Sequence, residues 1–165
     1  MDKQKYLNSL SKKFERYFDI EFQKEVLGIQ LDMVAKHYSL NVRTFLTNND
    51  IIDSYENNEY IFIKHYSCLD DSKVKEFCNF LKDAADFYVS PKKNHMSTYI
   101  NGIILYDSID EGTKVIIRKF RNSKTFLFGL KGWFDTRLLA VGLNGQDIIC
   151  NREGKRVKKV YQITP

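Results

Sequence analysis

Two segments of this chain end in nearly the same word, AKHYS at Ala35–Ser39 and IKHYS at Ile63–Ser67, and they carry the polar pair that suggests chemistry. Asp32 lies on the first segment and Lys64 on the second. The residues between the two words are rich in Asn, Asp and short apolar runs, which is enough chain for a third strand or a wide loop. We therefore expect Asp32 and Lys64 to lie on neighbouring strands of one sheet.

Strand alternation divides the side chains of these segments between two faces. One face is cationic and aromatic, so it could bind an anion or stack nucleobases, or it could be an ordinary solvated face. The other face carries His37 and His65, which could ligate a metal with His95 as a third ligand, or could pack against the core with hydrogen-bonded rings. The cationic aromatic face consists of Lys36, Lys64, Tyr38 and Tyr66.

A second constellation surrounds the only tryptophan of the chain. Trp133 precedes Asp135 and Arg137, which share a strand face. An Asp–Arg pair at this spacing can brace a turn. With Lys131, the indole and the guanidinium could instead form a pocket in which Trp133 stacks and Arg137 binds a carboxylate or a phosphate.

The positive charge of the chain is concentrated in its C-terminal half. The net charge is +5, but residues 111–165 hold 12 Lys and Arg against 4 Asp and Glu, whereas residues 1–110 hold 14 against 17. This asymmetry favours contact with nucleic acid or another polyanion, although basic surfaces also keep small domains soluble. The basic residues that we expect to contact an anionic partner are Lys36, Arg118, Lys119, Arg121, Lys124, Lys131 and Arg137.

Length and composition indicate a single domain, residues 1–165, with a substantial core. Apolar residues make up 43% of the chain and aromatic residues 14%, which excludes a disordered protein. Three cysteines without CxxC spacing suit a reducing compartment. No apolar run approaches the roughly 18 residues of a membrane span, and the first residues lack a signal-peptide core. We expect a cytoplasmic protein without membrane contact.

The elements predicted for the first half begin with an amphipathic N-terminal helix within residues 1–18. Strands follow, with a turn at Gly28, a polar hairpin turn at 47–50 and a further turn at 56–59. A helix capped by Asp70 or Asp71 then runs to Tyr88. The predicted strands are 19–27, 29–40 and 60–66, with short apolar segments beside the turn at 47–50.

The second half is predicted as a covered, central strand at 98–106, a helix from Asp110 to Asn122, and further strands at 125–130, 135–143 and 147–150. Asn144-Gly145 is a strong hairpin signal. A basic C-terminal tail, 152–165, ends the chain as a short helix or a fraying segment. The order is α-β-β-(β)-β-α-β-α-β-β-β, so the predicted fold class is α/β (α+β), with a mixed central sheet flanked by helices.

This order resembles the core of the PD-(D/E)xK nuclease superfamily, a restriction-endonuclease-like fold. GIQLDMVAKHY is similar to the strand that carries the family's metal-binding Asp, and YIFIKHY is similar to the strand that carries Glu-x-Lys. The resemblance implies that Asp32 would bind Mg or Mn and that Lys64 would orient or activate water. Phe62, however, stands where the family has its acidic ligand. A migrated carboxylate would have to come from Glu15, Glu21 or Glu25.

A second resemblance covers nearly the whole chain. The words FLFGLKGWFDTRLLAVGLNG and CNREGKRVKKVY, with the earlier ENNEYIFIK and HMST, resemble an uncharacterised prokaryotic family classed as a domain of unknown function. That resemblance implies no activity. No Gly-rich phosphate loop, HExxH or GxSxG motif is present, so the standard nucleotide-binding and hydrolase mechanisms lack support.

Three functional hypotheses follow. The first is a catalytically inactive, nuclease-like module that binds nucleic acid or regulates another protein, without a cofactor. The second is a protein-interaction or homodimerisation module that uses the aromatic surface. The third is a metal-dependent nuclease with Asp32 and Lys64 as catalytic residues and a migrated carboxylate.

Overall fold

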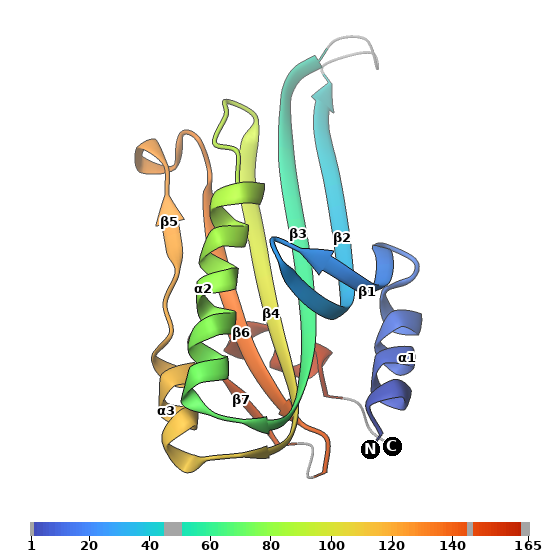
Figure 1. The fold of residues 1–165 in the computed structure, drawn as a ribbon. Coiled ribbons are helices and arrows are strands. Elements are labelled where there is room, and N and C mark those ends of the chain that lie inside the picture. The colour runs from blue at the N-terminus through green and yellow to red at the C-terminus, as the bar shows by residue number, and fades with distance from the viewer. Residues whose placement is uncertain (1, 45–50, 145–146, 163–165) are drawn as a thin grey trace.

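The computed structural model describes residues 2–44, 51–144 and 147–162, and it shows one mixed α/β domain built on a seven-stranded sheet (Figure 1). The strands follow the order β1-β2-β3-β4-β6-β5, and β7 also pairs with β6. This architecture confirms the predicted fold class. The strands are β1 Asp19–Val26, β2 Ile29–Thr44, β3 Ile51–Leu69, β4 His95–Ile109, β5 Ser123–Thr125, β6 Trp133–Gly142 and β7 Ile148–Cys150.

The sheet is antiparallel on one side and parallel at its centre. β2 pairs antiparallel with both β1 and β3, whereas β4 pairs parallel with both β3 and β6. Parallel neighbours need crossover connections, and these contain α2 (Asp71–Tyr88) and α3 (Glu111–Lys119). β5 and β7 both run antiparallel to β6. The central position predicted for the strand at 98–106 is confirmed, because β4 lies between β3 and β6.

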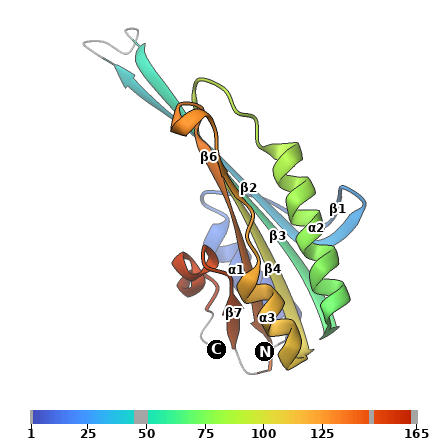
Figure 2. The same ribbon diagram turned by 90° about the vertical axis from the view of Figure 1, so that its left-hand side faces the viewer.

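Two hydrophobic cores lie on opposite faces of this sheet. α2 and α3 cover one face, while α1 (Lys3–Phe14) and the C-terminal turns cover the other (Figure 2). Alternation within a strand sends neighbouring residues to different cores, so Phe62 packs under α2 and Ile63 packs under α1. The C-terminal turns are two short 3-10 helices, η2 Gly154–Arg156 and η3 Lys158–Val160.

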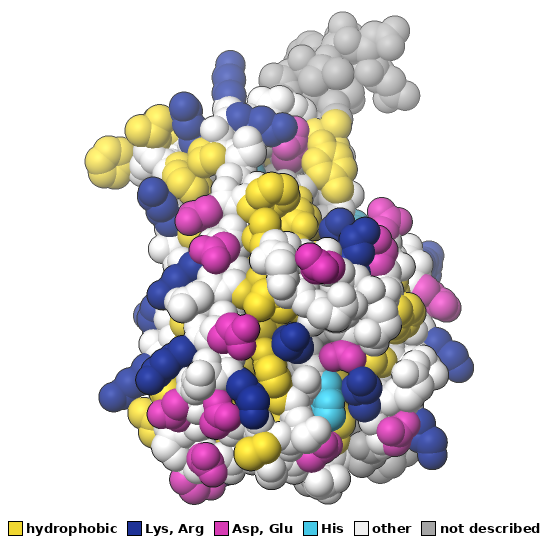
Figure 3. All heavy atoms as spheres, in the orientation of Figure 1, with side chains coloured by type: hydrophobic (Ala, Val, Ile, Leu, Met, Phe, Trp, Pro, Cys, Tyr) yellow, Lys and Arg dark blue, Asp and Glu magenta, His cyan; other side chains and the backbone are white. Residues whose placement is uncertain are grey.

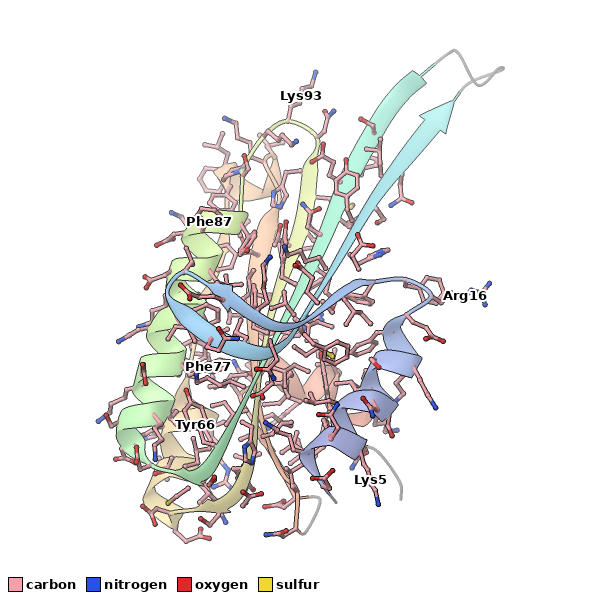
Figure 4. All side chains as sticks on the ribbon, turned by 45° about the vertical axis from the view of Figure 1, so that its right-hand side comes forward. Lys5, Arg16, Tyr66, Phe77, Phe87 and Lys93 are labelled. Carbon is pink, nitrogen blue, oxygen red and sulfur yellow. The ribbon has the colours of Figure 1, made fainter. Side chains whose placement is uncertain are left out.

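α2 begins where its sequence predicts, at a capping aspartate. The Asp70 carboxylate accepts a hydrogen bond from the Lys73 backbone N–H at 2.9 Å. Phe77 points into the core, whereas Phe87 is exposed near the end of the helix (Figure 4). Gly102 of β4 lets α2 pack closely on the sheet, since a Cβ there would lie 2.4 Å from Leu81 Cδ1.

The turn predicted at 56–59 is wrong, because these residues continue β3. Their polar character suits a turn locally, but strands on both sides supply partners. Asn57 pairs with Ser39 of β2 and with Ser97 of β4, whose hydroxyl donates to the Asn57 side chain at 2.7 Å. The hairpin turn predicted at 47–50 lies outside the described residues.

The strand predicted at 125–130 is also wrong. β5 ends at Thr125, and a tight turn, η1 Leu127–Gly129, follows. Leu127 and Phe128 have left-handed φ values of 46° and 54°, which break an extended chain. The N-terminal helix is shorter than predicted, because α1 ends at Phe14. The chain then turns so that Phe18 packs on Phe14, with 5.1 Å between the ring centroids.

Candidate functional site

A hollow of about 670 Å³ lies where the end of α3, the strand β7 and the C-terminal turns meet. Five basic side chains and one acidic side chain surround it, so its electrostatic character is strongly positive. We call it the basic hollow. Its lining residues are Arg118, Arg121, Asp147, Ile148, Ile149, Cys150, Arg152, Lys155 and Lys158.

The buried side chain of Asn151 fixes the point where the C-terminal turns begin. Its Oδ1 accepts hydrogen bonds from the backbone N–H groups of Leu138 at 3.0 Å and Gly154 at 2.8 Å. Its Nδ2 donates to the carbonyl oxygens of Thr136 at 3.0 Å and Phe120 at 3.4 Å. Gly154 is also needed for close approach, since a Cβ there would lie 2.9 Å from the Leu138 oxygen. These contacts tie the turns to β6 and to the end of α3, and so build one wall of the hollow.

The cationic side chains of the basic hollow differ in the hydrogen bonds and ion pairs that they already form within the chain. The Arg121 guanidinium donates to the carbonyl oxygens of Arg118 at 2.9 Å and Phe120 at 2.7 Å, which holds it at the end of α3. Within the described ranges, no carboxylate forms an ion pair with Arg118, Lys155 or Lys158. These three charges are therefore open to an external anion.

Cys150 brings a thiol to the same hollow. Burial raises the pKa of this thiol, although Lys158 and Lys155 act in the opposite direction. A nucleophilic cysteine needs a lowered pKa, so Cys150 does not have the character of a reactive thiol. The chemistry that the hollow offers is therefore electrostatic attraction for an anion.

The other predicted basic residues lie outside the basic hollow. Lys119 lies on another side of α3, where it lines a hollow of about 380 Å³ with Lys75 and Lys82 of α2. The Lys124 ammonium lies 5.4 Å from the centroid of the Phe126 ring, beside the turn η1. Lys131 follows the same turn and is exposed. Figure 3 shows Lys and Arg side chains along the edge formed by α3 and β5, and a group of hydrophobic side chains near the end that carries η1.

Arg137, predicted to bind a carboxylate or a phosphate beside Trp133, is engaged within this chain. Trp133 is half-buried at the start of β6, and Arg137 is buried further along the same strand. The Arg137 guanidinium instead reaches across the sheet to the Glu59 carboxylate at 3.2 Å and stacks on the Tyr99 ring, 3.7 Å from its centroid. Arg137 thus contacts a carboxylate, as its chemistry suggests, but the carboxylate belongs to this chain.

Strand register explains this network. Arg137 of β6 pairs with Asn101 of β4, and Asn101 pairs with Ile61 of β3. Asn101 Nδ2 donates to Glu59 Oε1 at 2.9 Å, and its Oδ1 accepts a longer hydrogen bond from Arg137 at 3.4 Å. Three adjacent strands therefore assemble the group on the face covered by α1.

A pocket of about 270 Å³ opens on this network between α1 and the C-terminal turns. Its walls are aromatic and aliphatic, and among the described residues the charged side chains that line it are Glu59 and Arg137. Burial raises the pKa of the Tyr161 hydroxyl in its wall, and the nearby Glu59 raises it further. We call it the aromatic pocket. Its lining residues are Phe14, Phe18, Glu59, Ile61, Arg137, Val157, Val160 and Tyr161.

Asp32 and Lys64 lie on adjacent strands, but the structure does not bring their charged groups together. The Asp32 carboxylate pairs with Lys3 of α1 at 2.9 Å and accepts a hydrogen bond from the His65 backbone N–H at 2.7 Å. Partial burial alone would raise the pKa of Asp32, but Lys3 and the His65 N–H together hold it below its ordinary value. The Lys64 ammonium donates to the Gln30 carbonyl oxygen at 2.8 Å.

A break in strand alternation separates the two groups. Leu31 and Val34 are three residues apart, yet both pack in the core under α2. The residues between them are therefore out of regular alternation, and Asp32 turns toward α1. Lys64 shares the parity of Phe62, which packs under α2, so it lies toward the opposite face.

The remaining predicted residues of this region are engaged separately. Glu21 pairs with Lys24 at 2.8 Å and with Lys36 at 3.5 Å. Glu15 caps the end of α1, and Glu25 is exposed on β1. The described part of the chain contains no group of three or more His, Cys, Asp or Glu side chains that could hold a metal ion.

The three histidines also lie apart, each with its own hydrogen bond. His37 Nδ1 donates to the Tyr17 carbonyl oxygen at 2.6 Å, and His65 Nε2 lies 3.2 Å from the Asp107 carboxylate. His95 is buried and donates to the Lys131 carbonyl oxygen at 2.9 Å.

In the part of the chain that the structure describes, no helix is long and apolar enough to cross a membrane.

Sequence reasoning missed Glu59 and the tail lysines as members of sites. Glu59 lies inside what was predicted as a turn, and its partner Arg137 is 78 residues away. Lys155 and Lys158 lie in a segment predicted only as a basic tail. The charge asymmetry of the C-terminal half was the one available signal for them.

Comparison with known proteins gives a family but no activity. No curated protein matches the chain. Among solved structures, a chain described as "Structure of EndoMS in apo form" matches with 11% identity and a TM-score of 0.34, covering 70% of this chain and 42% of that one. A likeness of this size carries no conclusion about fold or function. The family model described as "Domain of unknown function (DUF8052)" matches residues 2–163. Because that match spans nearly the whole sequence, the chain belongs to the DUF8052 family.

Proposed function

We propose that this protein is a nucleic-acid-binding module that holds a phosphate backbone in the basic hollow. The observation that carries the proposal is the convergence of five basic side chains on one hollow, four of them without a carboxylate partner in the described residues. Phosphate oxygens are the natural ligands of such a cluster, because Arg and Lys donate charge-assisted hydrogen bonds to them.

The proposal contains no cleavage step. Its support is the separation of Asp32 from Lys64, with Asp32 held by Lys3 on one face of the sheet and Lys64 directed toward the other. A metal-dependent nuclease needs these groups to converge with a second carboxylate on one cation. Binding without cleavage fits the arrangement better.

Salt dependence tests the proposal quantitatively. If Arg118, Lys155 and Lys158 each neutralise one phosphate, counterion release gives a slope of log K against log salt of about −2 for a single strand and about −3 for a duplex. Fluorescence anisotropy of a labelled oligonucleotide across a salt series measures this slope. The double variant K155Q/K158Q should weaken binding and reduce the slope by about two thirds.

The matched control is K5Q/K12Q on α1, which removes the same charge from two exposed lysines that form no ion pair in the described structure. It should change affinity far less than K155Q/K158Q. The proposal is overturned if affinity does not fall with salt, or if the two double variants weaken binding equally. The second outcome would indicate that only net charge matters.

A second candidate function, self-association, is favoured by the apolar side chains of the turn η1. Phe128 is fully exposed and Leu130 is 79% exposed, although large apolar groups usually avoid such exposure when they are clustered. Sedimentation equilibrium should then show a mass that rises with concentration, and F128S should lower that mass toward one chain. A single-chain mass at all concentrations would rule this candidate out.

A further inference from the structure

The floor of the aromatic pocket contains a buried cation with an unused donor. Arg137 is only 8% exposed, and its Nη1 is taken up by Glu59 and Asn101. Its Nη2 has no hydrogen-bond partner among the described residues and, unlike the unpartnered Nε, is not cut off from the surface. A ligand that brings an acceptor to Nη2 would therefore gain a charge-assisted hydrogen bond.

The same floor offers an acceptor beside that donor. Glu59 Oε1 accepts from Asn101 and from Arg137, whereas no described residue donates to Glu59 Oε2. The carboxylate is 28% exposed and lines the pocket, so its second oxygen is accessible. The floor therefore suits a ligand that has an acceptor and a donor close together on one edge.

The walls of the pocket suit a flat ring. Phe14 lies 5.1 Å from Phe18 and 6.2 Å from Tyr161, and the latter pair packs edge to face. Aliphatic side chains from the C-terminal turns close the other side. A volume of about 270 Å³ is slightly below the usual range of ligand pockets, so one small ring system fits and a long chain does not.

We propose that the aromatic pocket binds a single nucleobase, with guanine preferred. The guanine O6 would accept from Arg137 Nη2, and its neighbouring N1–H and amino group would donate to Glu59, while the ring stacks on the aromatic walls. Adenine has no carbonyl oxygen to offer Arg137. A simple anion would leave the aromatic walls unused, and an apolar ligand would leave both charges unsatisfied.

The base could belong to a free nucleoside or to a single strand. The C-terminal turns separate the two sites, since Lys155 and Lys158 line the basic hollow while Val157 and Val160 line the aromatic pocket. A strand held by its phosphates in the hollow could therefore place one base in the pocket. Only this strand source rests on the proposed function.

Guanosine is the probe that separates the two sites, because it has the base but no phosphate. Isothermal titration should show one saturable site, with about tenfold weaker binding of adenosine. V160W fills the rim of the pocket from a partly exposed position, and F18A removes one wall, so each should weaken guanosine binding at least about tenfold. F22A, which removes an exposed ring from β1, is the matched control and should leave binding unchanged.

Two further measurements separate the sources and the two proposals. Replacing one adenine by guanine in an oligoadenylate should raise its affinity, and V160W should abolish this gain, if the base comes from a strand. Guanosine binding without such a gain supports a free nucleoside. Absence of guanosine binding, or binding that V160W and F18A leave unchanged, overturns the inference. Salt-dependent strand binding would still stand in that case, and K155Q/K158Q should not affect guanosine.

Discussion

The basic hollow and the aromatic pocket lie on two sides of the same C-terminal turns, but they use charge in opposite ways. In the hollow, Lys155 and Arg152 are exposed and have open surroundings. In the pocket, Arg137 is buried, stacked on Tyr99 and paired with Glu59. The interaction between exposed charges is long-range, and salt screens it. A buried ion pair interacts only with a group that is placed directly against it in a suitable orientation.

This difference indicates a division of roles along one segment. A cluster of solvated cations suits affinity for any phosphate backbone, because it neutralises charge without reading shape. A pair of orientated polar groups between aromatic walls suits selection among ligands. A ligand whose hydrogen-bonding edge does not match these groups leaves buried donors or acceptors unpaired. Under the two proposals, the turns would connect a general contact with a selective one.

The largest effect is expected at Asn151, on which both sites depend. N151A leaves two backbone N–H groups and two carbonyl groups without their buried partner, so the free energy of unfolding should fall by about 3 kcal/mol or more. Urea unfolding measures this change. N8A, at an exposed position on α1, should change it by less than about 0.5 kcal/mol.

A loss below about 1 kcal/mol in N151A would show that the turns are not held to β6 as described. The comparison of the two sites would then lose its common support. If the variant remains folded, oligonucleotide and guanosine binding should weaken together, since one displaced segment walls both sites.

Much of the fold was predictable because its signals are local. The cap at Asp70 and the apolar spacing that follows define α2 within one stretch of sequence. The run around Ile103 and Ile104, apolar on both parities, identifies β4 as a covered strand. Such features depend on neighbours in the chain, so composition and periodicity suffice to find them.

The wrong predictions concern residues whose local structure depends on partners that are distant in the sequence. Asn57 has turn-like local chemistry, but Ser39 and Ser97 draw it into the sheet. Regular alternation was assumed for Asp32, and the break near it could not be predicted without knowing which core each neighbour joins. Arg118 and Arg121 were predicted as anion-binding residues, but the tail lysines that complete their hollow depend on how the last turns fold back.

The next effect concerns the pair at the pocket floor. R137M removes the partner of a partly buried carboxylate and should lower the free energy of unfolding by about 2 kcal/mol, less than the loss for a fully buried pair because Glu59 retains contact with water. A double-mutant cycle with E59Q should give a coupling energy of at least about 1 kcal/mol.

The matched cycle uses the exposed pair of Lys36 and Glu21, with K36Q and E21Q, where no measurable coupling is expected. Equal coupling in the two cycles would contradict the distinction between buried and exposed charge. Zero coupling between Arg137 and Glu59 would contradict the pocket floor itself.

The smallest effect is expected at Asp32, whose environment lies between these extremes. Its carboxylate is partly buried and has one cationic partner, Lys3, which helps to hold the pKa of Asp32 below its ordinary value of 3.8. Because the pKa is lower in the folded than in the unfolded protein, this contribution to stability is fully present above about pH 4 and is lost as the pH falls through the lowered pKa.

K3M should therefore destabilise the protein modestly at pH 7, and the difference from the wild type should vanish in acid. Urea midpoints at pH 7 and near pH 2 to 3 measure it, and K12M, which removes an exposed lysine without an ion pair in the described structure, should show no such pH-dependent difference. A difference that persists unchanged in acid would mean that Lys3 stabilises the domain through the packing of its aliphatic chain and that its charge on Asp32 adds nothing.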